Sequence, residues 1–503
     1  MSTNNIGRRV ADMREAAGLT QSELAKKIKT TQSAVARLES GTQNVSTDTL
    51  KKISKALGRN LLTLSPGSLS LEIEGGHTLS GTIETNTSKN GAVGLLCASL
   101  LNHGKTTLKS MPRIEEVHRL IEVLESIGVS VSWQGNDVVI TVPERLALER
   151  IDQAAAVKTR SIIMFIGALI HRMPRFTLPQ SGGCKLGSRT VRPHFYALEN
   201  FGVDIVTTET SFEVEAKGIK GKEREIILYE SGDTVTENAL LAAALSPGVT
   251  TIKYASANYM VQELCGFLAA AGVSIEGIGT TTLKVHGVSE IDSDIEYNLS
   301  EDPTDSMFFI AAAIVTNSAI TITRCPIDFL ELELLVLEKM GFKYKAGKPY
   351  LSKNGLTRLV DIETKPSKLI APPEKVHSRP YPGLNADNLP FFAVIATQAE
   401  GQTLIHDWMY EKRALYFTEL DKLGGDTLLA DPHRIYINGK TPLKGTELVC
   451  PPALRPATIL LIAMLGASGR SVLRNIYSIN RGYEKLVERL SSLGANVKYL
   501  EEF

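Results

Sequence analysis

Beyond about residue 68, one pattern of apolar and polar positions recurs along the chain. Each copy has an apolar helical run, a turn with glycine, a β-like run and an amphipathic helix that ends in an apolar residue plus glycine. The closing glycines stand at positions 128, 202, 272, 341, 424 and 494, with spacings of 74, 70, 69, 83 and 70 residues. A near-constant period of this length, with helix and strand alternating in each copy, predicts six repeats of one α/β unit.

The first sixty residues follow a different pattern, which is helical only. Thr20 and Glu23 form a capping box that opens a short helix with Leu24, Ala25 and Ile28 turned inward. After a tight turn, Thr31 caps a second helix over residues 32–39, and a third helix follows. The inward positions of these two helices are Val35, Leu38, Leu50, Ile53 and Leu57. Two short helices joined by a tight turn predict a helix-turn-helix.

Charge separates the same two parts of the chain. The 503 residues carry 55 basic and 55 acidic side chains, so the net charge is zero. Residues 1–60 hold eleven Lys or Arg and five Asp or Glu, a net charge of +6, and the remainder therefore carries −6. A small basic head on a larger acidic body favours contact between the head and nucleic acid.

The cysteines and histidines argue against metal and disulfide chemistry. Five cysteines are scattered without a CxxC pair, and the nine histidines show no metal-ligand spacing. Cys97 and Cys265 lie in apolar helical runs and are predicted to be packing residues. The longest apolar run, around residues 457–467, is too short to span a bilayer, and no signal peptide is evident. We therefore expect a cytoplasmic protein without metal or cofactor.

One cysteine stands apart from the others. Cys184 lies in the stretch GGCKLGSR, with glycines on both sides and with Lys185 and Arg189 nearby. The glycines favour a loop, and the cations favour the thiolate, so this cysteine is suited to act as a proton donor or nucleophile. On these residues alone, a cysteine that merely lies in a turn is an equally good interpretation.

The helical head resembles a known family. The string TQSELAKKIKTTQSAVARLESG is similar to the Cro/C1-type repressors, and the resemblance covers roughly residues 5–64. It implies a DNA-binding domain over residues 1–64, which binds double-stranded DNA as a homo-oligomer. Gln32, Ser33 and Arg37 would face the major groove, with Gln21 near a phosphate. Lys29 is a departure, because the family usually has glycine in the turn. The alternative is a helical bundle used for protein contacts.

The repeated body resembles the enolpyruvyl transferase family over residues 68–503. The implied fold class is α/β (α+β), with six βαβαββ-type units in two domains after the small all-α head. By this resemblance, residues 65–88 hold the linker and the first strands of transferase domain 2, residues 89–300 form transferase domain 1 with the catalytic loop, and residues 301–503 form the remainder of domain 2.

The family moves the 1-carboxyvinyl group of phosphoenolpyruvate to a hydroxyl and releases phosphate. The Gly-Gly-Cys loop is typical of the branch that uses UDP-N-acetylglucosamine and starts peptidoglycan precursor synthesis for the cell wall. The substrates bring a phosphate, a carboxylate and a diphosphate to one site. Such a site needs several fixed cations, one acid and one base.

The resemblance assigns roles to particular residues. Lys89 would bind phosphoenolpyruvate and Asn90 the sugar, while Asp387 would take the proton from the attacking hydroxyl. Cys184 would be the general acid, and Arg189 would close over the phosphate. The remaining cationic positions are Arg160, Arg413, Arg455 and Arg481.

Departures from the family cluster on the nucleotide. Residues 190–193 read Thr-Val-Arg-Pro where the family has Pro-Val-Asp-Leu, so Arg192 replaces an aspartate that contacts uracil. The stretch from Glu230 to Thr234 places Glu230 and Asp233 where the family binds the diphosphate, and Ala453 replaces a further aspartate. Two alternatives follow: a transferase with a different nucleotide or sugar acceptor, or a DNA-binding regulator that uses the fold as a ligand sensor.

Overall fold

A computed structural model describes residues 10–11, 14, 19–39, 49, 52–53, 56, 69–180, 190–218 and 223–501. The chain divides into two compact units, Met1–Leu69 and Ser70–Phe503. Within the described ranges, no helix has the length and apolar character needed to cross a membrane.

The first unit contains the predicted pair of helices, α2(Gln21–Lys27) and α3(Gln32–Glu39). The capping box is present, because the Thr20 hydroxyl accepts the backbone N–H of Glu23 and the Glu23 carboxylate accepts that of Thr20. The predicted inward residues form the core of this unit together with Val10; they are Leu24, Ala25, Ile28, Val35, Leu38 and Ile53. Leu50 and Leu57 lie outside the described residues. The helix-turn-helix prediction is therefore confirmed at these positions.

The turn between these helices is strained at Lys29. Its φ is +55°, in the left-handed region that favours glycine. The chain thus makes this turn with Lys29 at the position where the family resemblance implies glycine.

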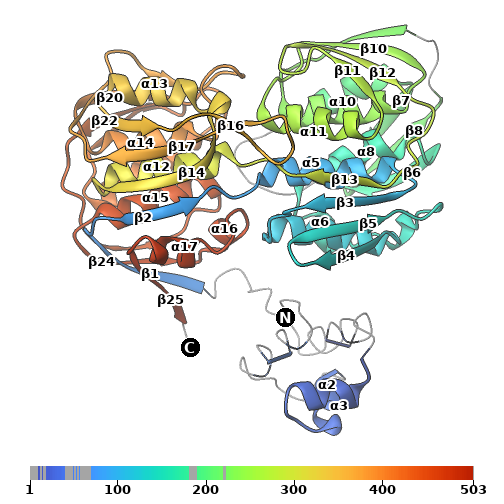
Figure 1. Cartoon of the computed structure of the whole chain (residues 1–503), viewed down its shortest axis with the longest axis horizontal. Helices are drawn as coiled ribbons and strands as arrows, with labels where there is room; N and C mark the ends of the chain where they lie inside the picture. The colour runs from blue at the N-terminus through green and yellow to red at the C-terminus, as the bar shows by residue number, and fades with distance from the viewer. Residues whose placement is uncertain are drawn as a thin grey trace. The chain divides into compact units, whose positions relative to one another are not determined.

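The second unit is built from two lobes (Figure 1). In the described residues, the first lobe has three sheets. Their strands in spatial order are β13(Ile295–Asn298)-β3(Lys105–Lys109)-β5(Asp137–Thr141)-β4(Ser130–Gln134), β6(Arg175–Pro179)-β8(Ser211–Ala216)-β7(Val203–Thr207), and β11(Ser274–Glu276)-β12(Thr282–Gly287)-β10(Gly248–Lys253)-β9(Glu223–Ile227). The helices are α5(Lys89–Ala98), α6(Glu115–Ser126), α7(Gln153–Ala156), α8(Phe165–Leu169), α9(Arg192–Glu199), α10(Asp233–Ala244) and α11(Tyr259–Ala270), with 3-10 turns η1(Ser99–Leu101), η2(Leu148–Arg150) and η3(Arg160–Met164).

The second lobe also shows three sheets among the described residues. Their strands are β23(Glu447–Val449)-β24(Gly469–Arg474)-β1(Leu69–Gly75)-β25(Asn496–Glu501), β15(Lys343–Ala346)-β17(Arg358–Lys365)-β14(Ala319–Pro326)-β2(Ser80–Glu84) with β16(Tyr350–Leu351) on β17, and β18(Leu369–Ile370)-β20(Ala399–His406)-β22(Arg434–Gly439)-β21(Thr427–Asp431) with β19(Val376–His377) on β20. The helices are α12(Pro303–Val315), α13(Glu331–Lys339), α14(Leu389–Ala396), α15(Leu454–Gly466), α16(Tyr477–Asn480) and α17(Leu486–Ser492), with η4(Ile327–Phe329) and η5(Arg413–Leu423).

The repeat in the sequence corresponds to a repeat in the structure. All six closing glycines have positive φ, between 72° and 98°. They follow the ends of α6, α9, α11, α13, η5 and α17, where a left-handed residue ends a helix and turns the chain into the next strand. Six repeats therefore give six sheets in the described residues, and the six-unit fold class is confirmed. The domain boundaries at residues 64, 88 and 300 stay predictions.

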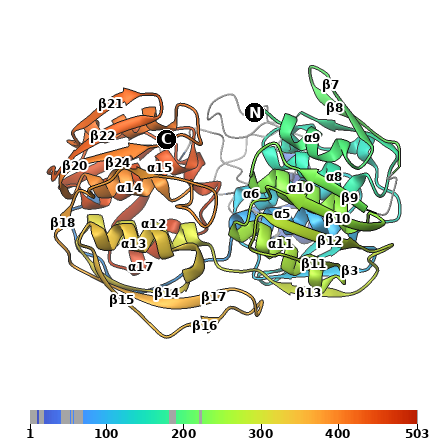
Figure 2. The same ribbon diagram turned by 90° about the horizontal axis from the view of Figure 1, so that it is seen from above.

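Apolar helices fill the interior of each lobe. In the second lobe, α12, α14 and α15 pack on one another between the sheets, as Figure 2 shows from above. In the first lobe, α5 and α10 pack on α11. Cys97 on α5 and Cys265 on α11 are fully buried there, which agrees with their predicted packing role.

Candidate functional site

Two segments that cross between the lobes bring the first site residues into place. Thr87 and Glu301 form an antiparallel bridge, and the backbone N–H of Ser88 donates to the Ser300 carbonyl at 2.7 Å. Ser88 is also the N-cap of α5, since its hydroxyl accepts a backbone N–H of that helix. Lys89 is therefore the first residue of α5, directly at the crossover.

Lys89 shares a carboxylate with a cation from the other lobe. Its Nζ lies 2.9 Å from Oε2 of Glu116 on α6, and Nε of Arg481 lies 3.5 Å from the same oxygen. Burial opposes ionisation of Glu116, but the charges of Lys89 and Arg481 outweigh it and hold the pKa of this carboxyl below its usual value. The structure thus brings Lys89, predicted to bind phosphoenolpyruvate, close to Arg481, one of the other predicted cationic positions.

Asp387 and Arg455 form the second part of the site. Nη2 of Arg455 lies 3.2 Å from Oδ2 of Asp387 and 2.9 Å from the Thr304 hydroxyl, and Nη1 lies 2.9 Å from the Tyr483 hydroxyl. Burial works against the ionised Asp387, yet the charges of Arg455 and Arg413 lower its pKa below the usual value. The predicted base is therefore a carboxylate at neutral pH.

Arg413 is buried and contacts the backbone next to Asp387. Its side chain is 1% exposed and forms a buried ion pair with Asp407. Nη2 also donates to the carbonyl of Ala386 at 2.8 Å, directly before Asp387. In this arrangement Arg413 holds the backbone that carries Asp387, and its guanidinium is engaged by protein groups.

Two further predicted residues lie on the first lobe. Asn90 donates through Nδ2 to the hydroxyl of Tyr259 at 2.9 Å. Arg160, the first residue of η3, donates to the carbonyl of Thr190 at 3.1 Å. Thr190 follows residues 181–189, which lie outside the described residues and include Cys184 and Arg189.

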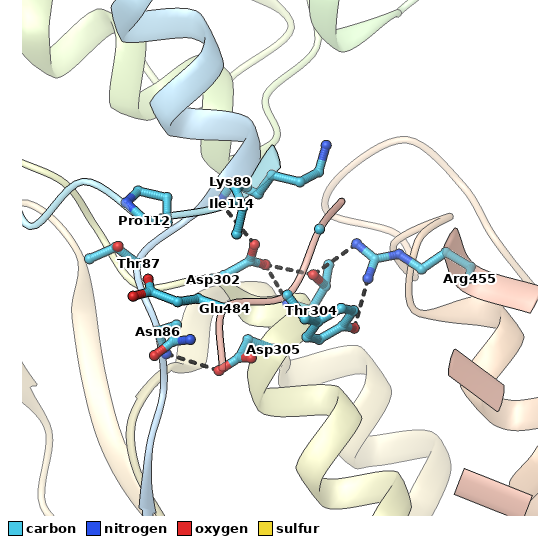
Figure 3. Close-up of a pocket in the computed structure, with 12 residues that line it drawn as sticks. Asn86, Thr87, Lys89, Pro112, Ile114, Asp302, Thr304, Asp305, Arg455 and Glu484 are labelled. Atoms are coloured by element: carbon cyan, nitrogen blue, oxygen red, sulfur yellow. Dashed lines mark hydrogen bonds between the residues drawn. The ribbon is translucent and has the colours of Figure 1, made fainter. Parts of the chain in front are cut away.

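Lys89 and Arg455 line one pocket (Figure 3), and Asp387, Asn90 and Arg481 are not among its lining residues. Its walls come from both crossover segments, from the loop before α6 and from the turn after α16. The lining residues include Lys89 and Arg455 together with Asn86, Thr87, Pro112, Ile114, Asp302, Thr304, Asp305, Gly482, Tyr483 and Glu484. Figure 3 shows Asp302 beside Thr304, whose hydroxyl donates to its carboxylate at 2.7 Å.

Sequence reasoning missed several of these residues. Asp302 is the N-cap of α12, followed by Pro303, and this Asp-Pro pair before an apolar run is a helix-start signal that marks the second crossover. Glu116 and Tyr259 carry no local signal, because each joins the site through partners far away in the sequence.

The departures from the family pattern lie at the starts of three helices: Arg192 is the first residue of α9, Ala453 is the N-cap of α15, and residues 230–234 lie at the start of α10. Glu230 is exposed, and its carboxylate would lie 2.8 Å from a Cβ placed on Gly232, the N-cap of α10. Asp233 begins the helix and accepts the hydroxyl of Ser256 at 2.6 Å and Nδ2 of Asn258 at 3.2 Å. Two carboxylates thus lie at the N-terminal end of α10, where the helix dipole would otherwise favour a bound anion.

The head presents the residues predicted to meet DNA. Gln32, Ser33 and Arg37 are exposed on α3, and Ser33 and Arg37 are four residues apart on one face. Nε2 of Gln32 donates to Oε1 of Gln21 at 3.2 Å, so the predicted phosphate contact lies beside the predicted groove contacts. Gln21 is itself held by Glu39 at 2.8 Å.

Comparison with known proteins defines the class. Residues 73–490 match the EPSP synthase (3-phosphoshikimate 1-carboxyvinyltransferase) family, and residues 10–64 match the helix-turn-helix family. A solved enolpyruvyl transferase, NikO from Streptomyces tendae, has the same fold, with a TM-score of 0.75 and 24% identity over 87% of this chain and all of that one. EPSP synthase from Acinetobacter baumannii superposes with a TM-score of 0.66 at 18% identity, over 86% of this chain and 100% of that one. The chain therefore belongs to the enolpyruvyl transferase family and is an enzyme of that kind, with a helix-turn-helix head.

Curated relatives narrow the class further. A UDP-N-acetylglucosamine 1-carboxyvinyltransferase from Treponema denticola is 35% identical over 86% of this chain and 99% of that protein. The protein of the same name from Bradyrhizobium diazoefficiens is 32% identical over 86% of this chain and 98% of that protein. The resemblance inferred from the Gly-Gly-Cys loop is confirmed: within its family, the chain groups with the UDP-N-acetylglucosamine 1-carboxyvinyltransferases.

Proposed function

We propose that this chain transfers the 1-carboxyvinyl group of phosphoenolpyruvate to a hydroxyl of UDP-N-acetylglucosamine, releasing phosphate in the first step of peptidoglycan precursor synthesis. The observation that supports it most is the placement of Lys89, Arg455 and Asp387 around one crossover between two lobes. A fixed carboxylate beside fixed cations is what addition of a hydroxyl to an anionic enol ester requires.

The residues divide the chemistry between them. Asp387 accepts the proton of the attacking hydroxyl as the new C–O bond forms at C2, while a proton reaches C3 from Cys184. The tetrahedral intermediate then loses phosphate and a C3 proton, which restores the double bond. Lys89 and Arg481 offset the charge of the phosphate and the carboxylate during both steps.

The ion pairs around the pocket also hold these cations in fixed positions. Lys89 and Arg481 already share Glu116, and Arg455 already contacts Asp387. An arriving anionic substrate therefore meets cations that neighbouring carboxylates hold in position, so little side-chain entropy is lost on binding.

Phosphate release from phosphoenolpyruvate tests the proposal. The wild type is expected to release phosphate only when UDP-N-acetylglucosamine is added. Lys89→Met, Cys184→Ala and Asp387→Asn should each lower kcat/KM by roughly a hundredfold or more. Lys105→Met is the control, because Lys105 is an exposed lysine of the same lobe that pairs with Asp294.

The outcomes separate the alternatives. Release with another nucleotide or sugar, and none with UDP-N-acetylglucosamine, would favour a different acceptor. Absence of release with every acceptor would refute enolpyruvyl transfer by this chain.

We infer that the head binds double-stranded DNA, that the chain works as a homo-oligomer and that it acts in the cytoplasm. The exposed Gln32, Ser33 and Arg37 on α3 support the DNA contact. Arg37→Ala should weaken binding to a selected operator by roughly tenfold and relax its sequence preference. The control Lys27→Ala should cause a smaller loss that is equal for all sequences. Equal DNA affinity of Arg37→Ala and wild type would refute the groove contact.

Light scattering tests the oligomeric state. A monomeric mass would refute the homo-oligomer.

A further inference from the structure

Three aromatic rings link the two lobes beside the site. Tyr259 of α11 meets Phe329 of η4 edge-to-face, with 5.8 Å between ring centroids. Phe329 in turn meets Tyr381, which precedes α14, at 5.2 Å. Although Phe329 belongs by sequence to the second lobe, its side chain is 9% exposed and packs into the apolar core of the first lobe. These three residues are called the aromatic bridge below.

One end of the aromatic bridge holds Asn90. The Tyr259 hydroxyl accepts Nδ2 of Asn90 at 2.9 Å, and the Tyr259 side chain is 4% exposed at the first position of α11. Burial and the charges of Asp302 and Asp387 raise the pKa of Tyr259 well above its ordinary value, so the hydroxyl keeps its proton. This bond uses one of the two N–H groups of the Asn90 amide and leaves its carbonyl oxygen Oδ1, the only acceptor of the side chain, for a donor of the sugar.

The other end of the aromatic bridge is Tyr381, which lies in the loop that leads to Asp387. The backbone N–H of Arg379 donates to the carbonyl of Leu384 at 3.0 Å, which closes the turn that contains Tyr381. The buried carboxyl of Glu333 then accepts the N–H of Asn385 at 3.1 Å, just before Asp387. A short segment with these hydrogen bonds therefore joins Tyr381 to Asp387.

We propose that the aromatic bridge aligns Asn90 of one lobe with Asp387 of the other, and that Tyr259 is a positioning residue for the sugar acceptor. This inference rests on the proposed function, because it assigns the bridge to the acceptor half of that reaction. The acceptor must offer an N–H or O–H to Oδ1 of Asn90 while its attacking hydroxyl faces Asp387. The distances from the acceptor to Asn90 and to Asp387 both depend on the relative position of the lobes, and Phe329 is one of the side chains that cross between the lobes.

Tyr259→Phe tests the hydrogen-bonded end, because it removes only the hydroxyl and keeps the ring. The KM for UDP-N-acetylglucosamine should rise roughly 3- to 10-fold, as expected for loss of one neutral hydrogen bond, with the KM for phosphoenolpyruvate unchanged. Tyr297→Phe is the matched control. Tyr297 is 5% exposed, donates its hydroxyl to the Glu263 carbonyl at 3.2 Å and contacts Phe267 edge-to-face, all within the same lobe.

Phe329→Leu tests the central ring. It should lower kcat roughly tenfold. Phe267→Leu removes a ring that is 1% exposed and contacts Tyr297 within one lobe, and it should leave kcat within about twofold. The double variant Tyr259→Phe/Phe329→Leu should lose less kcat/KM than the product of the two single losses, because both changes act on the position of Asn90.

The results are distinguishable from failure of the proposed function, since wild-type turnover is measured first. A wild type that turns over, together with a Tyr259→Phe variant that keeps the wild-type acceptor KM, would overturn the aromatic bridge and leave the proposed function standing. Equal losses in the bridge variants and their controls would also overturn it, because the effects would then be those of general destabilisation.

Discussion

At the scale of single residues, the site is a set of charges that are already paired. Lys89, Arg455 and Arg413 each contact a carboxylate, and only the first two line the pocket. The family resemblance assigned Lys89 to phosphoenolpyruvate binding and catalysis, and Arg413 and Arg455 alike to substrate binding. Which of these cations reaches the pocket depends on burial and on partners distant in the chain, such as Asp407 and Glu116. A local sequence pattern cannot show either.

Lys29 gives a prediction about the stability of the head. Because Lys29 has a φ of +55°, Lys29→Gly should relieve backbone strain and stabilise the head by about 0.5–1 kcal/mol. Hydrogen exchange of residues 19–39 in the full chain should become slower. Lys26→Gly, at an exposed position within α2, should have the opposite effect, since glycine destabilises a helix interior by about 1 kcal/mol. Faster exchange in Lys29→Gly would show that the turn is not strained.

Glu263 gives a prediction about pH. Burial raises the pKa of Glu263 to about 8 from a usual value of 4.5, and its carboxyl accepts the backbone N–H of Ser300 at the crossover. Between these two pH values the folded side chain keeps a proton that the unfolded chain releases, so its contribution to stability falls as the pH rises.

Glu263→Gln keeps an acceptor for Ser300 and removes this titration. The melting temperature should rise by a few degrees at pH 8, for a gain of about 1–3 kcal/mol, and stay close to wild type at pH 5. Glu213→Gln, at an exposed position of β8, should change neither value. An equal gain at both pH values would assign the effect to packing instead of ionisation.

At the scale of elements, the sequence predicted most of the fold. The glycine period located the ends of six helical elements, and the capping box located α2, because both signals are local and steric. The aromatic bridge and the Glu116 pairing could not be found this way, since they join α11 to η4 and α6 to α16. Their formation depends on how the two lobes dock.

The start of α10 carries an element-scale prediction. If the acceptor diphosphate binds where the family resemblance places it, the exposed Glu230 opposes it. Glu230→Lys should therefore lower the KM for UDP-N-acetylglucosamine by roughly 3- to 10-fold at low salt, and less at high salt. Glu223→Lys makes the same charge change at the far end of β9 and should have little effect. A higher KM in Glu230→Lys would place the diphosphate elsewhere.

At the scale of the whole molecule, one chain joins a basic helix-turn-helix head to an enolpyruvyl transferase body. The head matches its family over residues 10–64 and the body over residues 73–490, so together the two matches cover most of the chain. The intact Lys89 and Asp387 argue for catalysis over sensing alone, because a ligand sensor needs no base beside its cations.

The central claim is that the body makes an enolpyruvyl ether of UDP-N-acetylglucosamine. Mass spectrometry of the nucleotide after incubation with phosphoenolpyruvate tests it most directly. The expected product is UDP-N-acetylglucosamine enlarged by one carboxyvinyl group, formed in equal amount to the phosphate released and absent with Asp387→Asn. Unchanged UDP-N-acetylglucosamine after full incubation with the folded wild type would contradict the claim.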